Sequence, residues 1–196
     1  MRHHEIRTTD PFSSLQDRTR RHRADHNCGA YTYADGSLPG VLAAAVGAGR
    51  IVEVGTALGY TACWLASATP TTTVDTIEAD ELHVSLARDE IASYGFTDRV
   101  SVHAGDAMEI LPTLDHRRYD VAFFDGFTPT SVLLVLLHDR LRDGGILIAG
   151  NLSVGDTGPA LAELADATRW RTHSFGETAL AVKVPVNVPT QVVLPT

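Results

Sequence analysis

The sequence predicts an α/β domain in which a largely parallel sheet is covered by helices on both faces. From Leu38 onward, short apolar runs typical of buried strands alternate with amphipathic segments typical of helices. Near the C-terminus this alternation stops, and only Gly176 and Glu177 separate the strand-like runs RWRTHSF and TALAVKV. So short a connection predicts an antiparallel hairpin at the edge of the sheet.

Five apolar runs are predicted to form the parallel strands, over residues 50–55, 72–79, 99–106, 119–126 and 145–151. Helices are predicted between and after them, over residues 60–68, 80–94, 107–111, 130–141 and 157–168. The helix over 80–94 has the clearest limits, because Asp80 can cap its first turn and Gly95 lets the chain leave its end.

Three segments are predicted: a polar arm and lead-in over 1–37, the domain over 38–184, and an extended tail over 185–196. The first 26 residues hold six arginines and four acids, so an arm of charge +2 precedes a body of charge −10. This arm is predicted to be irregular or partly helical, and either to dock on the body or on a neighbouring subunit, or to be a frayed terminus. The tail PVNVPTQVVLPT suits an extended arm along a surface or partner, so a homodimer is one expectation.

Composition narrows the function. The net charge of −8 argues against a nucleic-acid partner, which needs a basic surface, and favours a small-molecule partner. Two cysteines are too few for a disulfide framework and agree with a reducing cytoplasm. The N-terminus lacks the apolar core of a signal peptide, and the longest apolar run, over residues 132–137, is too short to cross a bilayer. A cytoplasmic protein without a membrane partner is expected.

The ends of the predicted strands carry the chemistry. Ligands of parallel sheets bind beyond the carboxyl ends of the strands. The first strand runs into Gly55 and Gly59, a turn that includes Thr56 and brings bare backbone and a helix N-terminus toward a ligand. Glu78, Asp106 and Asp125 lie at or beside the ends of the next three strands. Each acid alone has the alternative of a helix cap, but together they favour a cationic ligand that contains ribose.

Five motifs follow one another within residues 38–184: IVEVGTALGYTACWLA, TIEADELHVSLA, VSVHAGDAMEILPTL, YDVAFFDG and LRDGGILIAGNL. Together they resemble the class I S-adenosylmethionine methyltransferases, and within these the small catechol and caffeoyl-CoA O-methyltransferase family. The resemblance implies a Rossmann-like, doubly wound sheet of seven strands whose last strand is antiparallel to the rest.

The resemblance also implies which residues surround S-adenosylmethionine: Glu53 and Gly55 at its methionine part, Tyr60 and Thr61 at its carboxylate, Glu78 with Ala79 and Asp80 at its ribose, Asp106 and Ala107 along its adenine, and Asp125 at its ammonium group. Phe127 is predicted to stack on the adenine or on the acceptor, with ordinary packing as the alternative.

The motifs depart from the metal-dependent relatives at two positions. Those relatives carry a lysine where this chain has Thr128 and an aspartate where it has Gly150. The remaining metal ligands would be Asp125 and Asn151, unless Asp156 or a substrate oxygen joins them. A hard divalent cation takes about six oxygen ligands, so weak or no metal dependence is expected.

A hydroxyl acceptor must lose a proton, and several side chains are candidates for the base: His22, His26, Tyr31, Tyr33, His138 and Asp125. Asp125 and His26 are predicted to be catalytic, although surface histidines are common. Tyr31 and Tyr33 are predicted either to floor an acceptor pocket or to pack. His138 lies among leucines and valines, which indicates a structural role.

The sequence therefore predicts S-adenosylmethionine-dependent O-methylation of a small molecule, with aromatic molecules among the candidate acceptors. One alternative is a protein that binds S-adenosyl ligands without catalysis and acts through assembly, which the losses at positions 128 and 150 motivate. The other is a nicotinamide oxidoreductase, which the glycine spacing and the single lysine, Lys183, disfavour.

Overall fold

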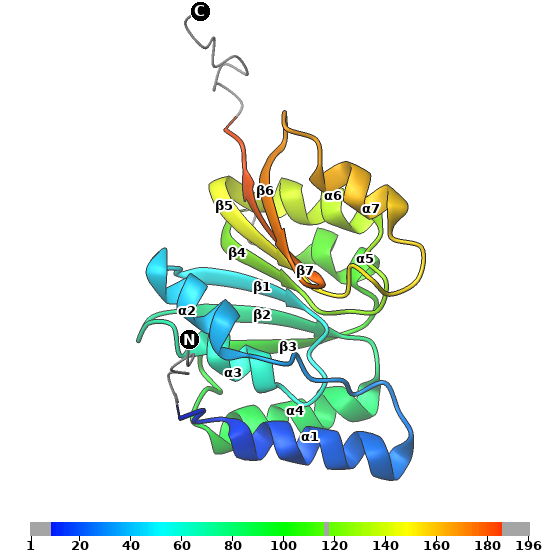
Figure 1. The fold of residues 1–196 in the computed structure, drawn as a ribbon. Helices are drawn as coiled ribbons and strands as arrows, with labels where there is room; N and C mark the ends of the chain where they lie inside the picture. The colour runs from blue at the N-terminus through cyan, green and yellow to red at the C-terminus, as the bar shows by residue number, and fades with distance from the viewer. Residues whose placement is uncertain (1–8, 116–117, 186–196) are drawn as a thin grey trace, which may run out of the picture.

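In a computed structural model that describes residues 9–115 and 118–185, seven strands form one sheet in the order β3-β2-β1-β4-β5-β7-β6 (Figure 1). The strands are β1 (Arg50–Val54), β2 (Thr73–Glu78), β3 (Val100–Ala104), β4 (Tyr119–Phe124), β5 (Leu141–Ala149), β6 (Trp170–Phe175) and β7 (Thr178–Lys183). β1 to β5 pair in parallel, and β7 is antiparallel to both β5 and β6. The predicted fold class, including the antiparallel last strand, is confirmed.

Helices cover both faces of this sheet (Figure 1). They are α1 (Ser13–His26), α2 (Ser37–Ala45), α3 (Tyr60–Ala66), α4 (Glu81–Ser93), α5 (Ala107–Ile110), α6 (Ser131–Arg140) and α7 (Gly158–Leu164), with a short 3-10 turn at Leu111–Thr113. α2, α3 and α4 pack with α1 on one face, and α5, α6 and α7 pack on the other. No helix among the described residues is long and apolar enough to cross a membrane.

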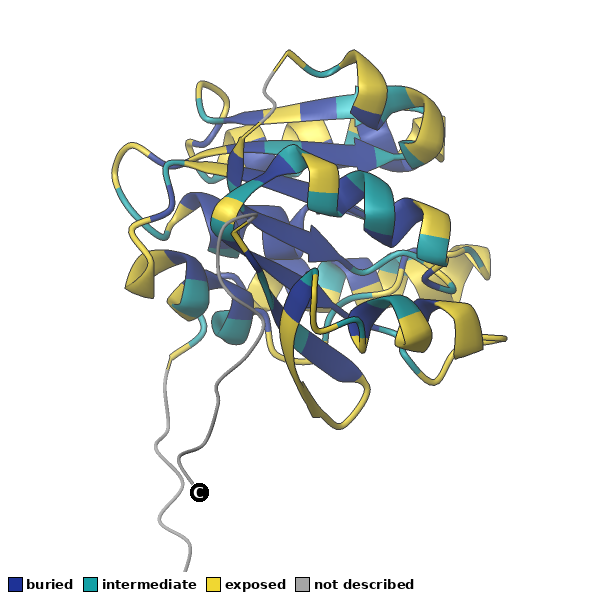
Figure 2. Cartoon of the chain, turned by 90° about the horizontal axis from the view of Figure 1, so that it is seen from above, coloured by how far each residue is buried: buried dark blue, intermediate teal, exposed yellow. Residues whose placement is uncertain are grey.

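The core consists of two apolar layers, one on each side of the sheet, because successive side chains of a strand point to opposite faces. Ile51 of β1 packs under the α2–α4 layer, whereas its neighbour Val52 packs under the α5–α7 layer. The central strands are buried on both faces and the helices expose only their outer sides (Figure 2). This accounts for the nearly continuous apolar runs of the strands.

The N-terminal arm contains a regular helix that docks on the body of the protein. Leu15 and Thr19 of α1 are buried, and Arg18 forms two hydrogen bonds with the carboxylate of Glu90 on α4, of which Nε to Oε1 is 2.6 Å. A bidentate pair of this kind fixes orientation as well as distance. The tail from residue 186 onward lies outside the described residues.

Two local features differ from the prediction. α2 was not predicted, because Pro39 and Gly40 in SLPGVLAAA are ordinarily loop signals. β5 begins at Leu141 rather than at residue 145, since the DGG run at 143–145 lies within the strand, where the pairing register with β4 shifts. No strand was predicted for residues 141–144, because glycine and aspartate are ordinarily loop signals.

Candidate active site

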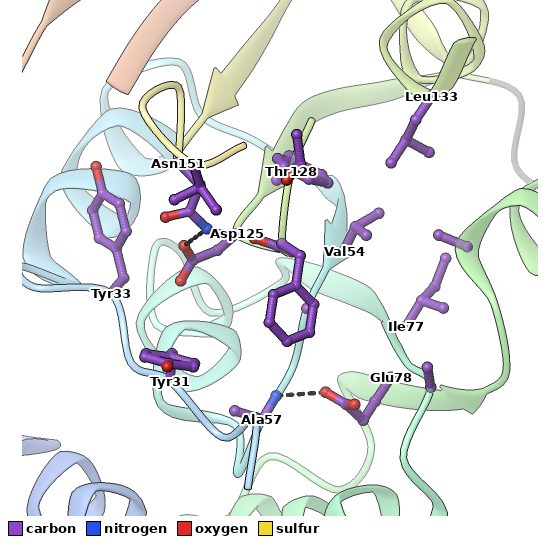
Figure 3. Close-up of a pocket in the computed structure, with 18 of the residues that line it drawn as sticks. Tyr31, Tyr33, Val54, Ala57, Ile77, Glu78, Asp125, Thr128, Leu133 and Asn151 are labelled. Atoms are coloured by element: carbon purple, nitrogen blue, oxygen red, sulfur yellow. Dashed lines mark hydrogen bonds between the residues drawn. The ribbon is translucent and has the colours of Figure 1, made fainter. Parts of the chain in front are cut away.

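A cavity of about 960 Å³ opens at the carboxyl ends of β1, β2, β4 and β5. It lies where the chain order of the sheet reverses between β1 and β4, the usual ligand position in such folds. Loops after these strands form most of its wall, and the segment 29–34 before α2 closes another side (Figure 3). Its volume suits a ligand of drug size or a cofactor together with a small acceptor.

Glu78, the last residue of β2, presents a fixed carboxylate at the cavity wall. Its Oε2 accepts a hydrogen bond of 2.8 Å from the backbone N–H of Ala57, and its Oε1 accepts one of 3.0 Å from the N–H of Asp80 (Figure 3). Ala57 has φ of +46°, so the turn after β1 holds a strained residue in contact with this acid. The carboxylate is therefore oriented before a ligand binds.

Asp125 presents a second carboxyl group, at the end of β4. Its backbone N–H donates to the carbonyl of Val54, which ties the ends of β4 and β1 together. Burial raises the pKa of Asp125 to about 7, although a hydrogen bond from Asn151 Nδ2 to Oδ1, at 3.2 Å, lowers it (Figure 3). This carboxyl group is consequently poised to change protonation near neutral pH.

The wall between the two acids is apolar. Val54, Ile77 and Leu133 project into the cavity on one side, and Tyr31 and Tyr33 lie on the opposite side (Figure 3). The hydroxyl of Tyr33 shares a 2.7 Å hydrogen bond with that of Thr178. Apolar walls with a few fixed polar groups are typical of sites for flat organic ligands.

The sequence of residues 52–152 matches a family model described as a methyltransferase domain. The chain belongs to this methyltransferase family. Catechol O-methyltransferase of Mycobacterium tuberculosis is 36% identical over 129 residues, which are 65% of this chain and 58% of that protein. This chain therefore aligns with less than two thirds of that relative.

Solved methyltransferases share the fold of the whole domain. The O-methyltransferase TomG from Streptomyces achromogenes, solved in complex with S-adenosylmethionine, superimposes with a TM-score of 0.79 at 23% identity, covering 92% of each chain. An O-methyltransferase from Bacillus cereus, in complex with S-adenosylhomocysteine, gives a TM-score of 0.75 at 22% identity, covering 91% of this chain and 92% of that one.

The methyltransferase cavity collects about half of the residues predicted to bind the cofactor. Among the described residues, the predicted ones that line it are Gly55, Glu78, Ala79, Asp106, Ala107, Asp125 and Phe127. Those that lie outside its lining are Glu53, Thr56, Gly59, Tyr60, Thr61 and Asp80, together with the predicted base His26. Phe127 is 71% exposed, which leaves its ring available at the cavity for a ligand.

The residues outside the lining have other partners. The Tyr60 hydroxyl donates to Asp10 Oδ2 at 2.7 Å, and Asp80 caps α4 by accepting hydrogen bonds from the N–H groups of Leu82 and His83. His26 is exposed at the end of α1, so its position does not favour the catalytic role predicted for it. Asp80 is therefore a helix cap, which was predicted as an alternative to a ligand contact.

Glu53 of β1 is a fully buried acid outside the cavity lining. Its Oε1 accepts a hydrogen bond from the Thr61 hydroxyl and its Oε2 accepts one from the Thr76 hydroxyl, each at 2.5 Å. Burial raises the pKa of Glu53 to about 8, and the two threonine hydroxyls oppose this rise. The folded protein therefore favours the protonated form of this side chain at neutral pH.

The free energy of unfolding should depend on pH through Glu53. The unfolded chain releases this proton near pH 4.5, but the folded protein keeps it until about pH 8, so the free energy of unfolding falls as pH rises between these values. In Glu53→Gln we expect this part of the slope to disappear. Urea unfolding of both proteins between about pH 5 and about pH 9 measures the difference; parallel pH profiles would contradict the assignment.

Gly55 allows the ends of β1 and β4 to approach each other. Its φ is +96°, and a Cβ at this position would lie 2.7 Å from the carbonyl oxygen of Asp125. Gly47 also has positive φ, at +60°, but a Cβ there would meet nothing within 4 Å. An alanine at position 47 would therefore introduce backbone strain alone, whereas an alanine at position 55 would introduce the strain and a steric clash.

Gly47→Ala should cost about 1–2 kcal/mol of stability through backbone strain alone. Gly55→Ala should cost a further 1–3 kcal/mol or so and displace the Asp125 loop, because the contact is with backbone that cannot rotate away. Thermal unfolding of both variants tests this order. Equal losses would show that the β1 and β4 ends are not in tight contact.

Most of the apolar lining residues, and those from loops in the C-terminal half of the chain, were not predicted from the sequence. They are Val54, Ile77, Met108, Thr130, Leu133, Val154, Glu177 and Thr178. The apolar members look like core residues in the sequence, and the others come from loops without a chemical motif. Tyr31 and Tyr33, which were predicted either to floor a pocket or to pack, do line it. His138 packs against Trp170 with ring centroids 4.7 Å apart, in line with a structural role.

Proposed function

We propose that this chain is an S-adenosylmethionine-dependent O-methyltransferase that acts on a small, aromatic acceptor. The observation that carries the proposal is the pairing of two fixed acids, Glu78 and Asp125, across an apolar cavity at the switch point of the sheet. The names of the relatives support it, since they include a catechol O-methyltransferase and structures with S-adenosyl ligands.

The cavity residues suit the parts of this cofactor. Glu78 would accept hydrogen bonds from the two ribose hydroxyls, because its carboxylate already stands at the end of β2. Asp106, Ala107 and Met108 would line the adenine, and the bare backbone at Gly55 would face the methionine part. Asp125 would face the positive charge of the cofactor, which would lower the pKa of this carboxyl group and favour its ionised form.

The cofactor supplies a methyl group that is already activated by its sulfonium sulfur. The chain then has to orient the acceptor, exclude water and remove a proton from the acceptor hydroxyl. We propose that Tyr31, Tyr33 and Phe127 hold an aromatic acceptor beside Asp125. Asp125 is the proposed proton acceptor, because the positive charge of the cofactor would keep its carboxylate ionised beside the acceptor hydroxyl.

Weak or no dependence on magnesium is part of this proposal. Asn151 turns its amide nitrogen toward Asp125 Oδ1, so it donates a hydrogen bond instead of offering oxygen beside the carboxylate. A Cβ at Gly150 would lie 3.3 Å from the same oxygen, where an aspartate would bring a second carboxylate. Asp156 accepts a hydrogen bond from the Gly158 N–H. Asp125, Asn151 and Asp156 therefore offer too few free oxygen ligands for a hard cation, which takes about six.

A cytoplasmic location and a homodimer are further proposals that rest on the sequence. Cys28 and Cys63 are both free thiols, which agrees with a reducing compartment. Light scattering coupled to size exclusion measures the mass in solution, and a monomer at all protein concentrations would remove the dimer.

Turnover with a panel of phenols and catechols tests the proposed reaction. The purified chain, in metal-free buffer with and without added magnesium, is incubated with S-adenosylmethionine and each acceptor, and S-adenosylhomocysteine is quantified. We expect product with at least one acceptor and an unchanged rate on adding magnesium. Strict magnesium dependence would contradict the metal argument. Cofactor binding with no product from any acceptor would favour the non-catalytic alternative.

A further inference from the structure

Three side chains with soft metal-binding atoms meet outside the cavity, where the end of α1 lies beside the start of α4. They are His22 of α1, Cys28 after that helix, and His83 in the first turn of α4. One ligand atom from each lies within 4.8 Å of the others. His83 is buried and the other two are half-buried, so the group is largely shielded from solvent.

His22 has a buried polar atom that calls for a partner. Its Nε2 is buried and has no hydrogen-bond partner within residues 9–115 and 118–185. Leaving such a group unpaired costs about 1–3 kcal/mol. The ring of His22 lies 5.4 Å from that of His83, centroid to centroid, and nearly perpendicular to it. A bound metal ion would satisfy this nitrogen.

A carboxylate lies near one ring nitrogen of His83. Its Nδ1 lies 3.9 Å from Glu78 Oε1. Histidine ligands commonly direct their second ring nitrogen to a carboxylate, which orients the ring and increases its basicity. Nε2 of His83 would then be the atom that faces His22 and Cys28.

We propose that His22, Cys28 and His83 form a zinc site with two imidazole nitrogens and one thiolate. In a tetrahedral zinc site, ligand atoms lie about 3.4–3.6 Å apart, so the group must contract by roughly 1 Å. Water completes the tetrahedron, or His26 does, since its ring lies 4.6 Å from that of His22. This donor set selects a borderline-soft transition metal over magnesium.

The position of the site links the metal to the cavity. Gly29, Tyr31 and Tyr33, which follow Cys28 in the chain, line the cavity. His83 lies next to Glu78, another residue of the cavity lining. Zinc would link this segment to the start of α4. It would also fix His83 and so restrict the movement of the neighbouring Glu78 side chain. We therefore expect zinc to tighten S-adenosylhomocysteine binding by about fivefold or more, which is a typical coupling between sites. This coupling rests on the proposed function, whereas the metal site does not.

Cobalt titration of the reduced, metal-free full chain tests the site, because a thiolate bound to Co²⁺ gives a sulfur-to-metal absorption band. We expect one equivalent of Co²⁺, the thiolate band, and displacement by Zn²⁺. Cys28→Ser should lose the band and Cys63→Ala should keep it. His22→Gln and His83→Gln should weaken zinc binding by at least about tenfold, while His173→Gln, at an exposed position, should not. Circular dichroism verifies that each variant is folded.

A wild-type chain that gives no thiolate band, or a band that survives in Cys28→Ser, would overturn the zinc site. Calorimetry of S-adenosylhomocysteine with and without zinc tests the coupling separately. Equal affinities would overturn the coupling. If the chain binds zinc but no S-adenosyl ligand, the proposed function is contradicted and the metal site is supported.

Discussion

Glu78→Ala is expected to weaken S-adenosylmethionine binding by about 10- to 100-fold, because a hydrogen bond to a charged group contributes about 1.5–3 kcal/mol. The substitution removes the acceptor for the ribose hydroxyls. It also frees the backbone N–H groups of Ala57 and Asp80, which the carboxylate now holds. Isothermal titration calorimetry of wild type and variant measures the change.

Glu81→Ala is the matched control for this experiment. Glu81 is an exposed acid three residues along the chain, in the first turn of α4, and it lies outside the cavity lining among the described residues. Its replacement removes the same charge from the same neighbourhood and should leave the affinity unchanged. Equal weakening by both substitutions would mean that the general acidity of this surface attracts the cofactor, not the ribose contact.

Asp125→Asn is expected to lower kcat by about 100-fold or more, since general-base catalysis typically contributes 10²- to 10⁴-fold. It should also change how cofactor affinity depends on pH. A cationic ligand prefers the ionised carboxylate, so wild-type affinity should rise as pH passes through about 7. The variant cannot ionise and should lose this rise. Steady-state kinetics and calorimetry from about pH 6 to about pH 8 measure the two effects.

Asp156→Asn makes the same chemical change at an acid beyond β5, outside the cavity lining within the described part of the chain. It should retain both turnover and the pH dependence of affinity. If Asp125→Asn keeps the wild-type kcat, Asp125 is not the base. If its affinity still rises through neutral pH, another group carries that titration.

The fold was predictable because the central strands are buried on both faces and most of the helices bury one side. The runs of β1 and β4 are therefore largely apolar, although β1 contains Glu53 and β4 contains Asp120, and Asp80 and Gly95 mark the limits of α4. α2 and the start of β5 were not predictable from the sequence. Proline and glycine usually indicate loops, but in these two segments tertiary packing overrides that local preference.

The candidate site was predictable only where backbone geometry or charge leaves a signal. Gly55, Glu78 and Asp125 stand at strand ends, and the alternation of strands and helices brings those ends together. Ile77 and Leu133 gave no signal, since a side chain lining a cavity has the same apolar character as one in the core. Glu53 was predicted to bind the cofactor, but its buried side chain is hydrogen-bonded to Thr61 of α3 and Thr76 of β2 and does not line the cavity.

The central claim is that the acids at the strand ends bind an S-adenosyl ligand and not a nicotinamide dinucleotide. Direct calorimetric titration of the wild-type chain with S-adenosylhomocysteine and with NAD tests it. We predict one S-adenosylhomocysteine per chain and no heat from NAD. Saturable NAD binding, with no binding of either S-adenosylmethionine or S-adenosylhomocysteine, would contradict the claim.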